Sequence, residues 1–367
     1  MSLQQKIADI KFELSRTQVN KATMHHICMM RAKMAKYQKE LLEPAKKGPA
    51  GEGFDVQKFG DARVGMVGFP SVGKSTLLSA LTPTESKAAA YEFTTLTCIP
   101  GILDMYGSKI QLLDLPGIIE GAKDGKGRGK QVISVARTCD CILLMVDGCK
   151  SLDLIEKIEF ELECVGIRLN KSPPRIRVER TNIGGVNFTP SIPQSELNQE
   201  IVRLILKEHR IMSANVYCDC DATVQDLIDV IEENCKYIPC IYVINKMDAM
   251  DPAHVEKLKT LPYFCCVSAF QQQGLEELKA MIWEHLNLVR IYTKPQGKGV
   301  PDFKDPIVLP ASKATVENVS FKIHKDLAKQ MKYAMVWGTS VKQNPQRVGK
   351  DHRLDDEDVL QIMKSGK

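Results

Sequence analysis

The chain has 367 residues, of which 44% are hydrophobic and 26% charged, as in an average globular protein. This composition excludes wholesale disorder and fibrous repeats, and the length predicts two or three domains. The net charge of +5 is unevenly spread, because residues 1–50 carry ten Lys or Arg against four Asp or Glu and residues 290–367 carry fifteen against nine, whereas the middle is acidic. Such basic ends indicate a polyanionic partner.

Targeting and redox signals indicate an ordinary intracellular protein. No apolar stretch reaches the roughly 18–20 residues that a membrane helix needs, and the amino terminus lacks the apolar core of a signal peptide. The twelve cysteines follow no spacing of a common zinc site and fall largely in apolar runs, which is typical of reduced, buried thiols. The sequence therefore predicts a soluble, cytoplasmic protein that makes no membrane contact.

Residues 1–47 predict a helical hairpin. Leu3, Ile7, Ile10 and Leu14 recur at helical spacing, and a second apolar series follows in residues 24–41. Lysines occupy other faces, so the hairpin either packs on the body of the protein or acts as an arm that contacts RNA. The Pro- and Gly-rich segment that follows is typical of a linker.

The pattern changes at Ala62, where short apolar runs begin to alternate with helical segments. This alternation predicts an α/β domain over residues 62–287, with a mostly parallel sheet and helices on both faces. The stretch between Asp114 and Asn245 is about 80 residues longer than the elements that it needs to contain. We therefore expect an inserted α/β subdomain at approximately 166–236. The predicted strands are 63–67, 110–114, 141–147, 238–245 and 264–267.

A further small domain is predicted after His285. It should contain about four strands around one helix that runs from Val316 to about Lys329, with Thr315 as its N-cap. Lysines on or beside this helix suit contact with phosphate groups. The aromatic residues of this domain are expected in its core rather than as stacking platforms for bases. They are Phe321, Tyr333 and Trp337.

A phosphate-binding loop follows the first predicted strand of the α/β domain. The segment meets the pattern GxxxxGK[ST] between a strand and a helix, the context in which that pattern is meaningful. Its backbone N–H groups can face phosphates, Lys74 can reach the β and γ phosphates, and the Ser75 hydroxyl can bind Mg²⁺. The residues are Gly68, Phe69, Pro70, Ser71, Val72, Gly73, Lys74 and Ser75.

Two further segments are predicted to complete the phosphate site. Asp114 ends a strand and can hold Mg²⁺ through water, while the Gly117 N–H can bond the γ-phosphate. A threonine between the two motifs is needed to complete the Mg²⁺ shell, and the residue pattern leaves Thr94, Thr95 and Thr97 equally eligible. The two segments comprise Asp114, Leu115, Pro116 and Gly117, and Phe93, Thr94, Thr95, Leu96 and Thr97.

A base-binding segment closes a later strand. The Asp248 carboxylate can accept both N1–H and the exocyclic amine of guanine, a donor pair that adenine does not present. Asn245 can tie the loop and face N7, and the Lys246 stem can cover the ring. A small residue after the last strand lets a backbone N–H approach guanine O6. The residues are Asn245, Lys246, Met247 and Asp248, with Ser268 and Ala269.

Together these motifs resemble the Obg-related GTPases, and the whole chain is similar to their developmentally regulated GTP-binding protein branch. The resemblance implies a helical amino-terminal region, an insertion in the G domain and a TGS domain of β-grasp fold at residues 290–366. It implies that Thr95 joins Ser75 as the Mg²⁺-binding pair, and that Lys74, Thr95 and Gly117 serve hydrolysis. It also implies a role in translation on ribosomes, with a regulatory protein of that GTPase family as partner.

Ile118 follows Gly117, where small signalling GTPases carry the Gln that orients the attacking water. An apolar side chain cannot polarise water, so we expect slow intrinsic turnover. A bound K⁺ at Ser71 is one hypothesis for the missing group. Glu120 and Arg128 are two others, although a solvent-facing carboxylate and a basic patch are the favoured interpretations of these residues.

The leading functional hypothesis is a Mg²⁺-dependent GTPase that couples its nucleotide state to contacts with ribosome and RNA through the basic ends. Two alternatives remain open. One is an ATPase of the same fold, which the intact segment Asn245–Asp248 argues against. The other is an RNA-binding scaffold that binds nucleotide only for stability and does not hydrolyse it.

Overall fold

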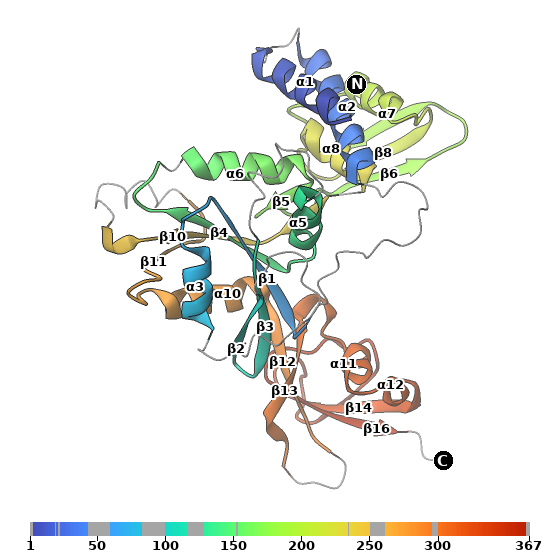
Figure 1. Cartoon of the computed structure of the whole chain (residues 1–367). Helices are drawn as coiled ribbons and strands as arrows, with labels where there is room; N and C mark the ends of the chain where they lie inside the picture. The colour runs from blue at the N-terminus through green and yellow to red at the C-terminus, as the bar shows by residue number, and fades with distance from the viewer. Residues whose placement is uncertain are drawn as a thin grey trace, which may run out of the picture. The chain divides into compact units, whose positions relative to one another are not determined.

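A computed structural model gives the fold of this chain (Figure 1). By contacts, the chain divides into two compact units. The first comprises residues 1–55, 117–137 and 153–238, and the second comprises residues 56–116, 138–152 and 239–367. The residues that the structure describes are 3–18, 20, 23–42, 59–82, 100–115, 128–151, 153–233, 235–249, 261–295 and 300–364.

The second unit contains a six-stranded sheet in the order β11-β10-β4-β1-β3-β2. All neighbours are parallel except β2, which is antiparallel to β3. Every residue of β1 and β4 is buried, as expected for apolar strands covered on both faces. The predicted mostly parallel α/β sheet is therefore confirmed. The strands are β1 (Ala62–Gly68), β2 (Pro100–Met105), β3 (Ser108–Asp114), β4 (Cys141–Asp147), β10 (Cys240–Asn245) and β11 (Phe264–Val267).

Two helices of the second unit pack on this sheet. Leu77 and Leu78 of α3 (Lys74–Leu81) and Leu278 and Ile282 of α10 (Leu275–Leu286) lie in one core cluster with strand residues such as Val64. The apolar positions recur at intervals of one and three or four residues, which is the spacing that turns one face of a helix toward a sheet. This packing sets where α3 begins relative to the end of β1.

The first unit contains the hairpin and the inserted subdomain. Cys28 and Ala32 of α2 are fully buried in one apolar cluster with Val202, Ile205 and Leu227 of the insertion. Of the two interpretations of the hairpin, packing on the body is thus observed for α2. The hairpin is α1 (Leu3–Arg16) and α2 (Met24–Leu42), and the other elements are α5 (Arg128–Ala136), α6 (Asp153–Cys164), β5 (Ile167–Leu169), β6 (Ile176–Arg180), β7 (Val186–Pro190), α7 (Gln199–Glu208), β8 (Ala214–Cys218), α8 (Val224–Glu232) and β9 (Lys236–Ile238).

Two short sheets organise the insertion. The strands β6, β8 and β7 form one sheet in that order, with β8 in the middle. A second, parallel pair joins β5 to β9, the two strands at which the chain enters and leaves the subdomain. Because its ends are paired, the inserted segment can form its own core between them, as an α/β subdomain should.

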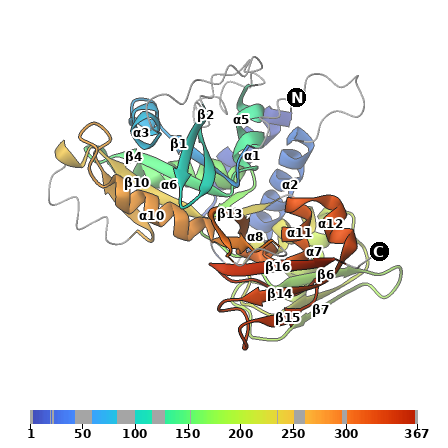
Figure 2. The same ribbon diagram turned by 90° about the horizontal axis from the view of Figure 1, so that it is seen from below.

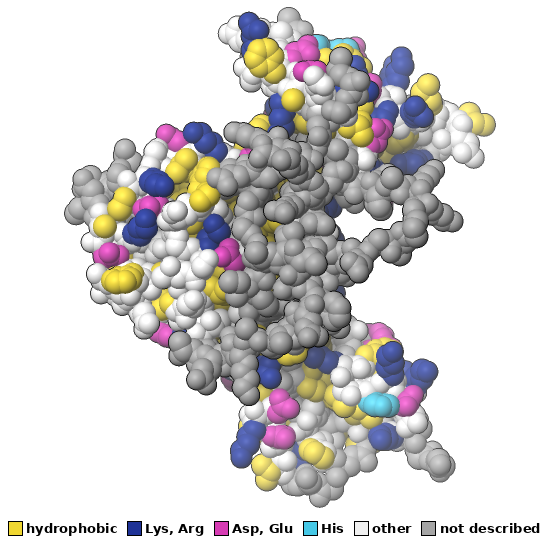
Figure 3. All heavy atoms as spheres, in the orientation of Figure 1, with side chains coloured by type: hydrophobic (Ala, Val, Ile, Leu, Met, Phe, Trp, Pro, Cys, Tyr) yellow, Lys and Arg dark blue, Asp and Glu magenta, His cyan; other side chains and the backbone are white. Residues whose placement is uncertain are grey.

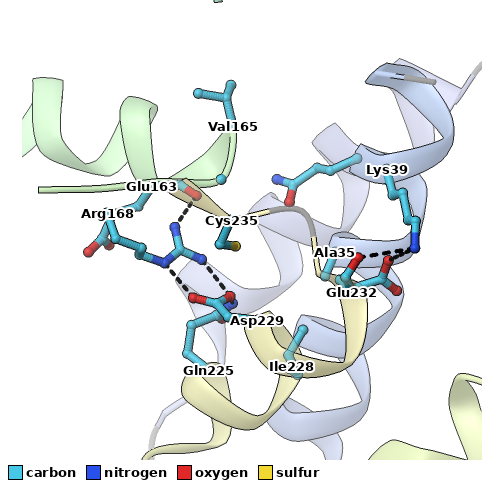
Figure 4. Close-up of a pocket in the computed structure, with 12 residues that line it drawn as sticks. Ala35, Lys39, Glu163, Val165, Arg168, Gln225, Ile228, Asp229, Glu232 and Cys235 are labelled. Atoms are coloured by element: carbon cyan, nitrogen blue, oxygen red, sulfur yellow. Dashed lines mark hydrogen bonds and ion pairs between the residues drawn. The ribbon is translucent and has the colours of Figure 1, made fainter. Parts of the chain in front are cut away.

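A buried polar junction joins α2 to α8 inside the first unit (Figure 4). The Lys39 ammonium lies 3.0 Å from the Glu232 carboxylate, which also lies 2.7 Å from Nδ1 of His209. Burial raises the pKa of Glu232, but hydrogen bonds from His209 and Lys39 outweigh it and hold that pKa below its usual range. Nearby, Arg168 donates two hydrogen bonds to Asp229, of 2.7 and 2.8 Å. The Lys39–Glu232 ion pair, as well as apolar packing, therefore holds the hairpin on the insertion.

The carboxy-terminal part of the second unit, which was expected to be a TGS domain, is a five-stranded sheet in the order β13-β12-β16-β14-β15, covered on one side by two helices (Figure 2). Val316 and Val319 pack against Ala334, Val336 and Leu360 of the sheet. The strands are β12 (Leu288–Thr293), β13 (Asp302–Pro310), β14 (Met331–Trp337), β15 (Gln346–Val348) and β16 (Asp358–Lys364), and the helices are α11 (Val316–Ile323) and α12 (Lys325–Gln330). The described part of the second unit also has two 3₁₀ turns, η1 (Met247–Ala249) after β10 and η2 (Ala311–Lys313) after β13.

Two details of the TGS prediction were wrong. The single helix is interrupted at His324, whose extended backbone ends α11 and whose Nδ1 accepts from the Asp326 N–H to begin α12. The aromatic residues also do not fill the core. Phe321 is 46% exposed, while Tyr333 and Trp337 alternate along β14 with the buried core residues.

No helix in the described part of the chain is both long and apolar enough to cross a membrane.

Candidate nucleotide-binding site

The loop between β1 and α3 has a backbone that only certain residues tolerate. Ser71 and Gly73 have φ angles of 63° and 94°, in the left-handed region. A Cβ at Gly73 would lie 2.3 Å from Nδ2 of Asn245, and one at Gly68 would lie 2.4 Å from the Met145 carbonyl oxygen. Both glycines are therefore required by close packing, and the loop curls tightly into the start of α3.

The amino terminus of α3 has no side-chain cap, because Gly73 occupies the N-cap position. The first N–H groups of a helix lack intrahelical partners, and the helix dipole favours an anion there. Lys74 adds a positive charge beside this terminus. Its ammonium is held at the loop, where it donates to the carbonyls of Gly68 at 2.9 Å and Phe69 at 3.0 Å. This arrangement suits a phosphate group.

Ser75 and Asp114 meet where α3 faces the end of β3. The Ser75 hydroxyl donates to Asp114 Oδ2 at 2.8 Å, and Asp114 is only 7% exposed. Its other oxygen, Oδ1, is buried without a hydrogen-bond partner among the described residues. Hydroxyl and carboxylate oxygens are the donors that Mg²⁺ prefers, and an orphaned carboxylate oxygen is costly unless a cation or water reaches it. The pair fits a Mg²⁺ ion.

Asn245 connects the loop after β1 to the segment after β11. Its Nδ2 donates to the Val72 carbonyl at 2.8 Å, and its Oδ1 accepts from the Ala269 N–H at 3.0 Å. The residue is 3% exposed, so both bonds are shielded from water. Asn245 thus brings together two of the sequence-predicted segments, in the tying role that was expected of it.

Lys246 is held by a residue that sequence reasoning missed. Its ammonium lies 2.6 Å from Oδ2 of Asp147, and the Cys149 N–H donates to Asp147 Oδ1 at 3.1 Å. Burial raises the pKa of Asp147, but these hydrogen bonds outweigh it and lower the pKa below its usual value. The sequence held only part of the signal, since Asp147 closes an otherwise apolar strand. Its pairing in register with Asn245 is seen only in the structure.

The remaining base-site residues lie beside these. Met247 and Asp248 are exposed in the 3₁₀ turn η1, so the Asp248 carboxylate is accessible. Ser268 and Ala269 are buried after β11, and the Ser268 hydroxyl accepts from the Gln271 N–H. The structure therefore brings Gly68–Ser75, Asn245–Asp248 and Ser268–Ala269 to the same edge of the sheet, where its parallel strands end.

Part of the predicted site falls on residues that the structure does not describe. These include the threonine segment and the residues that follow Leu115, and the side chain of Arg128 at the start of α5 is likewise outside. The undescribed site residues are Phe93, Thr94, Thr95, Leu96, Thr97, Pro116, Gly117, Ile118 and Glu120.

Three family models match consecutive parts of the chain. The model described as "50S ribosome-binding GTPase" matches residues 63–180, and the model of the C-terminal region of the MMR_HSR1 domain matches residues 183–288. The TGS domain model matches residues 289–364. The P-loop GTPase domain and the TGS domain of the predicted fold class are thereby confirmed.

Curated relatives match almost the whole chain. Developmentally-regulated G-protein 3 of Arabidopsis thaliana is 54% identical over 99% of both chains. Ribosome-interacting GTPase 1 of Saccharomyces cerevisiae is 51% identical over 98% of both chains. Developmentally-regulated GTP-binding protein 2 of Homo sapiens is 50% identical over 99% of this chain and 100% of its own.

Proposed function

We propose a function from one premise: the chain belongs to the family of developmentally regulated GTP-binding proteins. It acts as a Mg²⁺-dependent GTPase that converts GTP to GDP and couples its nucleotide state to ribosome contacts. The observation that carries this proposal is the double hydrogen bond of Asn245 to Val72 and Ala269. It makes the phosphate loop and the base-binding segments one connected site.

The base is guanine in this proposal. The accessible Asp248 carboxylate accepts from N1–H and the exocyclic amine. The Ala269 N–H, which was expected to face guanine O6, is bonded to Asn245 Oδ1 in the structure, so Asp248 carries the choice of base. Adenine offers no matching donor pair to a carboxylate, so the ATPase alternative is disfavoured. Competition of ATP against GTP for binding separates the two.

The phosphates and the metal ion occupy the start of α3. Ser75 and Thr95 would hold Mg²⁺ directly, and Asp114 would hold it through water. When bound, Mg²⁺ would supply positive charge beside the phosphate oxygens. The uncapped helix terminus and Lys74 bind the phosphate oxygens, and the Gly117 N–H reports whether the γ-phosphate is present.

Hydrolysis is intrinsically slow, because Ile118 offers no polar group to orient water. Lys74, Thr95 and Gly117 stabilise the transferred phosphoryl group, and the ribosome or a partner supplies the missing step. K⁺ at Ser71 is one candidate for that step, and activity that is indifferent to K⁺ versus Na⁺ at equal ionic strength would remove it.

The partners are a ribosome with its RNA and a regulatory protein of this GTPase family, in the cytoplasm. The Saccharomyces cerevisiae relative, at 51% identity, is named as a ribosome-interacting GTPase. The basic charge at residues 1–50 and 290–367 supports contact with a polyanion.

One experiment separates this proposal from the non-hydrolysing scaffold. Phosphate release from GTP is measured for the wild type, Lys74→Ala and Ser75→Ala, each with and without purified ribosomes. We expect slow release by the wild type, faster release with ribosomes, and loss of both in the variants. Equal, negligible release by all three proteins would support the scaffold instead.

A further inference from the structure

The TGS sheet has an outward face that is rich in aromatic side chains. Ala334 and Val336 of β14 are fully buried in the core beneath α11, so strand alternation turns Tyr333, Met335 and Trp337 to the opposite face. Register extends this face across the neighbouring strands, since Trp337 pairs with Val359 of β16 and Val359 pairs with Tyr292 of β12. Tyr292 and Trp337 therefore lie in one row, two strands apart.

Cations cover two of these rings. The Arg347 guanidinium carbon lies 4.1 Å from the centroid of the Tyr333 ring, and the Lys294 ammonium lies 4.8 Å from that of Trp337. Phe303, which is 59% exposed, meets Tyr292 edge to face with centroids 5.1 Å apart. We call these six residues the stacking face: Tyr292, Lys294, Phe303, Tyr333, Trp337 and Arg347.

The charge of this face favours an anionic partner. The outward positions of β14, β15 and β16, which carry the two main rings, include Arg347 and no carboxylate, and the exposed Asp302 and Asp305 lie at the edge of the face on β13. The other outward positions are Tyr333, Met335, Trp337, Val359, Gln361 and Met363. Aromatic rings bind the faces of unstacked bases, and Arg and Lys attract the phosphates between them. A protein segment rich in acidic residues would satisfy the cations but would leave the rings without a matching surface.

We propose that the stacking face binds single-stranded RNA. One base stacks on Trp337, with Lys294 turned from the ring to a phosphate, and another stacks on Tyr333 together with its covering Arg347 guanidinium. Trp337 lies four residues along β14 from Tyr333, roughly 13 Å, which separates two bases that stack independently. The inference deepens the proposed ribosome contact and rests on it for the biological source of the RNA. Base stacking on this face is separate from phosphate contact made by the lysines of α11 and α12. Basic side chains in the region of these helices are dark blue in Figure 3.

The test uses the full-length protein and fluorescein-labelled oligonucleotides of twelve uridines or twelve adenosines. Fluorescence anisotropy gives the dissociation constant for the wild type, Trp337→Ala, Tyr333→Ala and Trp337→Phe. Loss of one stacked base weakens binding about 5- to 150-fold, whereas Trp337→Phe keeps a ring and should stay near wild type. The matched control is Phe321→Ala, which removes an exposed ring from α11.

Two further measurements bear on the same face. Arg347→Ala should lower the slope of log affinity against log salt by about 0.7, the loss of one phosphate contact with a single strand. The chain has two tryptophans, so Trp283→Phe leaves Trp337 as the only indole. RNA that stacks on it should quench its fluorescence, and duplex RNA of equal length should quench it far less.

The outcomes distinguish this inference from the proposed function. Equal RNA affinities for Trp337→Ala, Tyr333→Ala and the wild type, with all three equally folded by circular dichroism, would overturn the stacking face. So would loss of ribosome co-sedimentation in Trp337→Ala with unchanged affinity for the oligonucleotides, because the face would then bind protein. Single-strand binding through Trp337 without any ribosome binding would uphold the face and remove the ribosome from the proposed function.

Discussion

Nδ2 of Asn245 donates a hydrogen bond of 2.8 Å to the carbonyl of Val72, from a position 173 residues further along the chain. The same side chain accepts from Ala269, so a single buried amide holds two loops in one arrangement. The shape of the phosphate loop therefore depends on a residue that belongs to the base-binding segment.

Asn245→Ala should disconnect these loops. The change leaves the Val72 carbonyl and the Ala269 N–H without their partner, at about 1–3 kcal/mol for each buried group. We expect the affinity for GDP to fall on the order of 100-fold or more, as measured by titration with a fluorescent GDP analogue. The control is Asn215→Ala, which breaks a side-chain bond to Asn187 in the inserted sheet and should leave GDP affinity intact.

Asp147→Asn should loosen Lys246. The substitution keeps the shape but removes the charge that holds the ammonium at 2.6 Å, so GDP affinity should fall roughly tenfold, or about 1.4 kcal/mol. Asp104→Asn, at an exposed carboxylate on β2, is the control. An unchanged affinity in Asp147→Asn would show that Lys246 keeps its place without the ion pair.

The same pair has a predictable pH dependence. The pKa of Asp147 is lowered in the folded protein, so the pair contributes stability above the unfolded carboxyl pKa of about 3.9. This contribution is lost as the pH falls through the lower, folded pKa. The difference in melting temperature between wild type and Asp147→Asn should therefore be full at pH 7 and shrink in strong acid.

Asp248→Asn should change which base is bound. An amide in place of the carboxylate presents a donor as well as an acceptor, so one of the two guanine donors loses its partner. Affinity for GDP should fall by on the order of 100-fold, whereas xanthosine diphosphate, with a carbonyl where guanine has its amine, should gain. Competition titrations of the two nucleotides measure the switch, and unaltered preference for guanine would contradict the assigned role of Asp248.

Glu232→Gln should weaken the attachment of the hairpin. It removes the charge shared by Lys39 and His209, which we expect to cost about 1–3 kcal/mol of the free energy of unfolding. The control is Glu163→Gln, whose carboxylate pairs with Lys171 at the surface and should matter little. Thermal unfolding and limited proteolysis measure the effect, and equal sensitivity of both variants would argue against the junction.

Local patterns predicted much of this molecule because they act over a few residues. The alternation of apolar strands and helices after Ala62 predicted the sheet, and the glycine spacing predicted the loop before Lys74. Asp147 was missed because its role depends on Lys246, 99 residues away, which meets it only when β4 and β10 lie side by side.

Two other misses have local causes. The interruption at His324 depends on a cap made by its own ring, a choice that apolar spacing does not report. Tyr333 and Trp337 were expected in the core because aromatic residues usually are, yet strand alternation assigns them to the face opposite Ala334. The role of the threonine segment remains a prediction, because residues 83–99 lie outside the described part of the chain.

The burial of Cys28 and Ala32 among α7 and α8 has a consequence for how the protein is made. The hairpin leaves the ribosome before the insertion, and the surface that it must cover is synthesised roughly 170 residues later. At about 5–20 residues per second, the apolar side of α2 waits on the order of 10–30 seconds for its partner. During that interval the nascent chain exposes a surface that chaperones can bind, and an amino-terminal deletion would leave the insertion with an incomplete core.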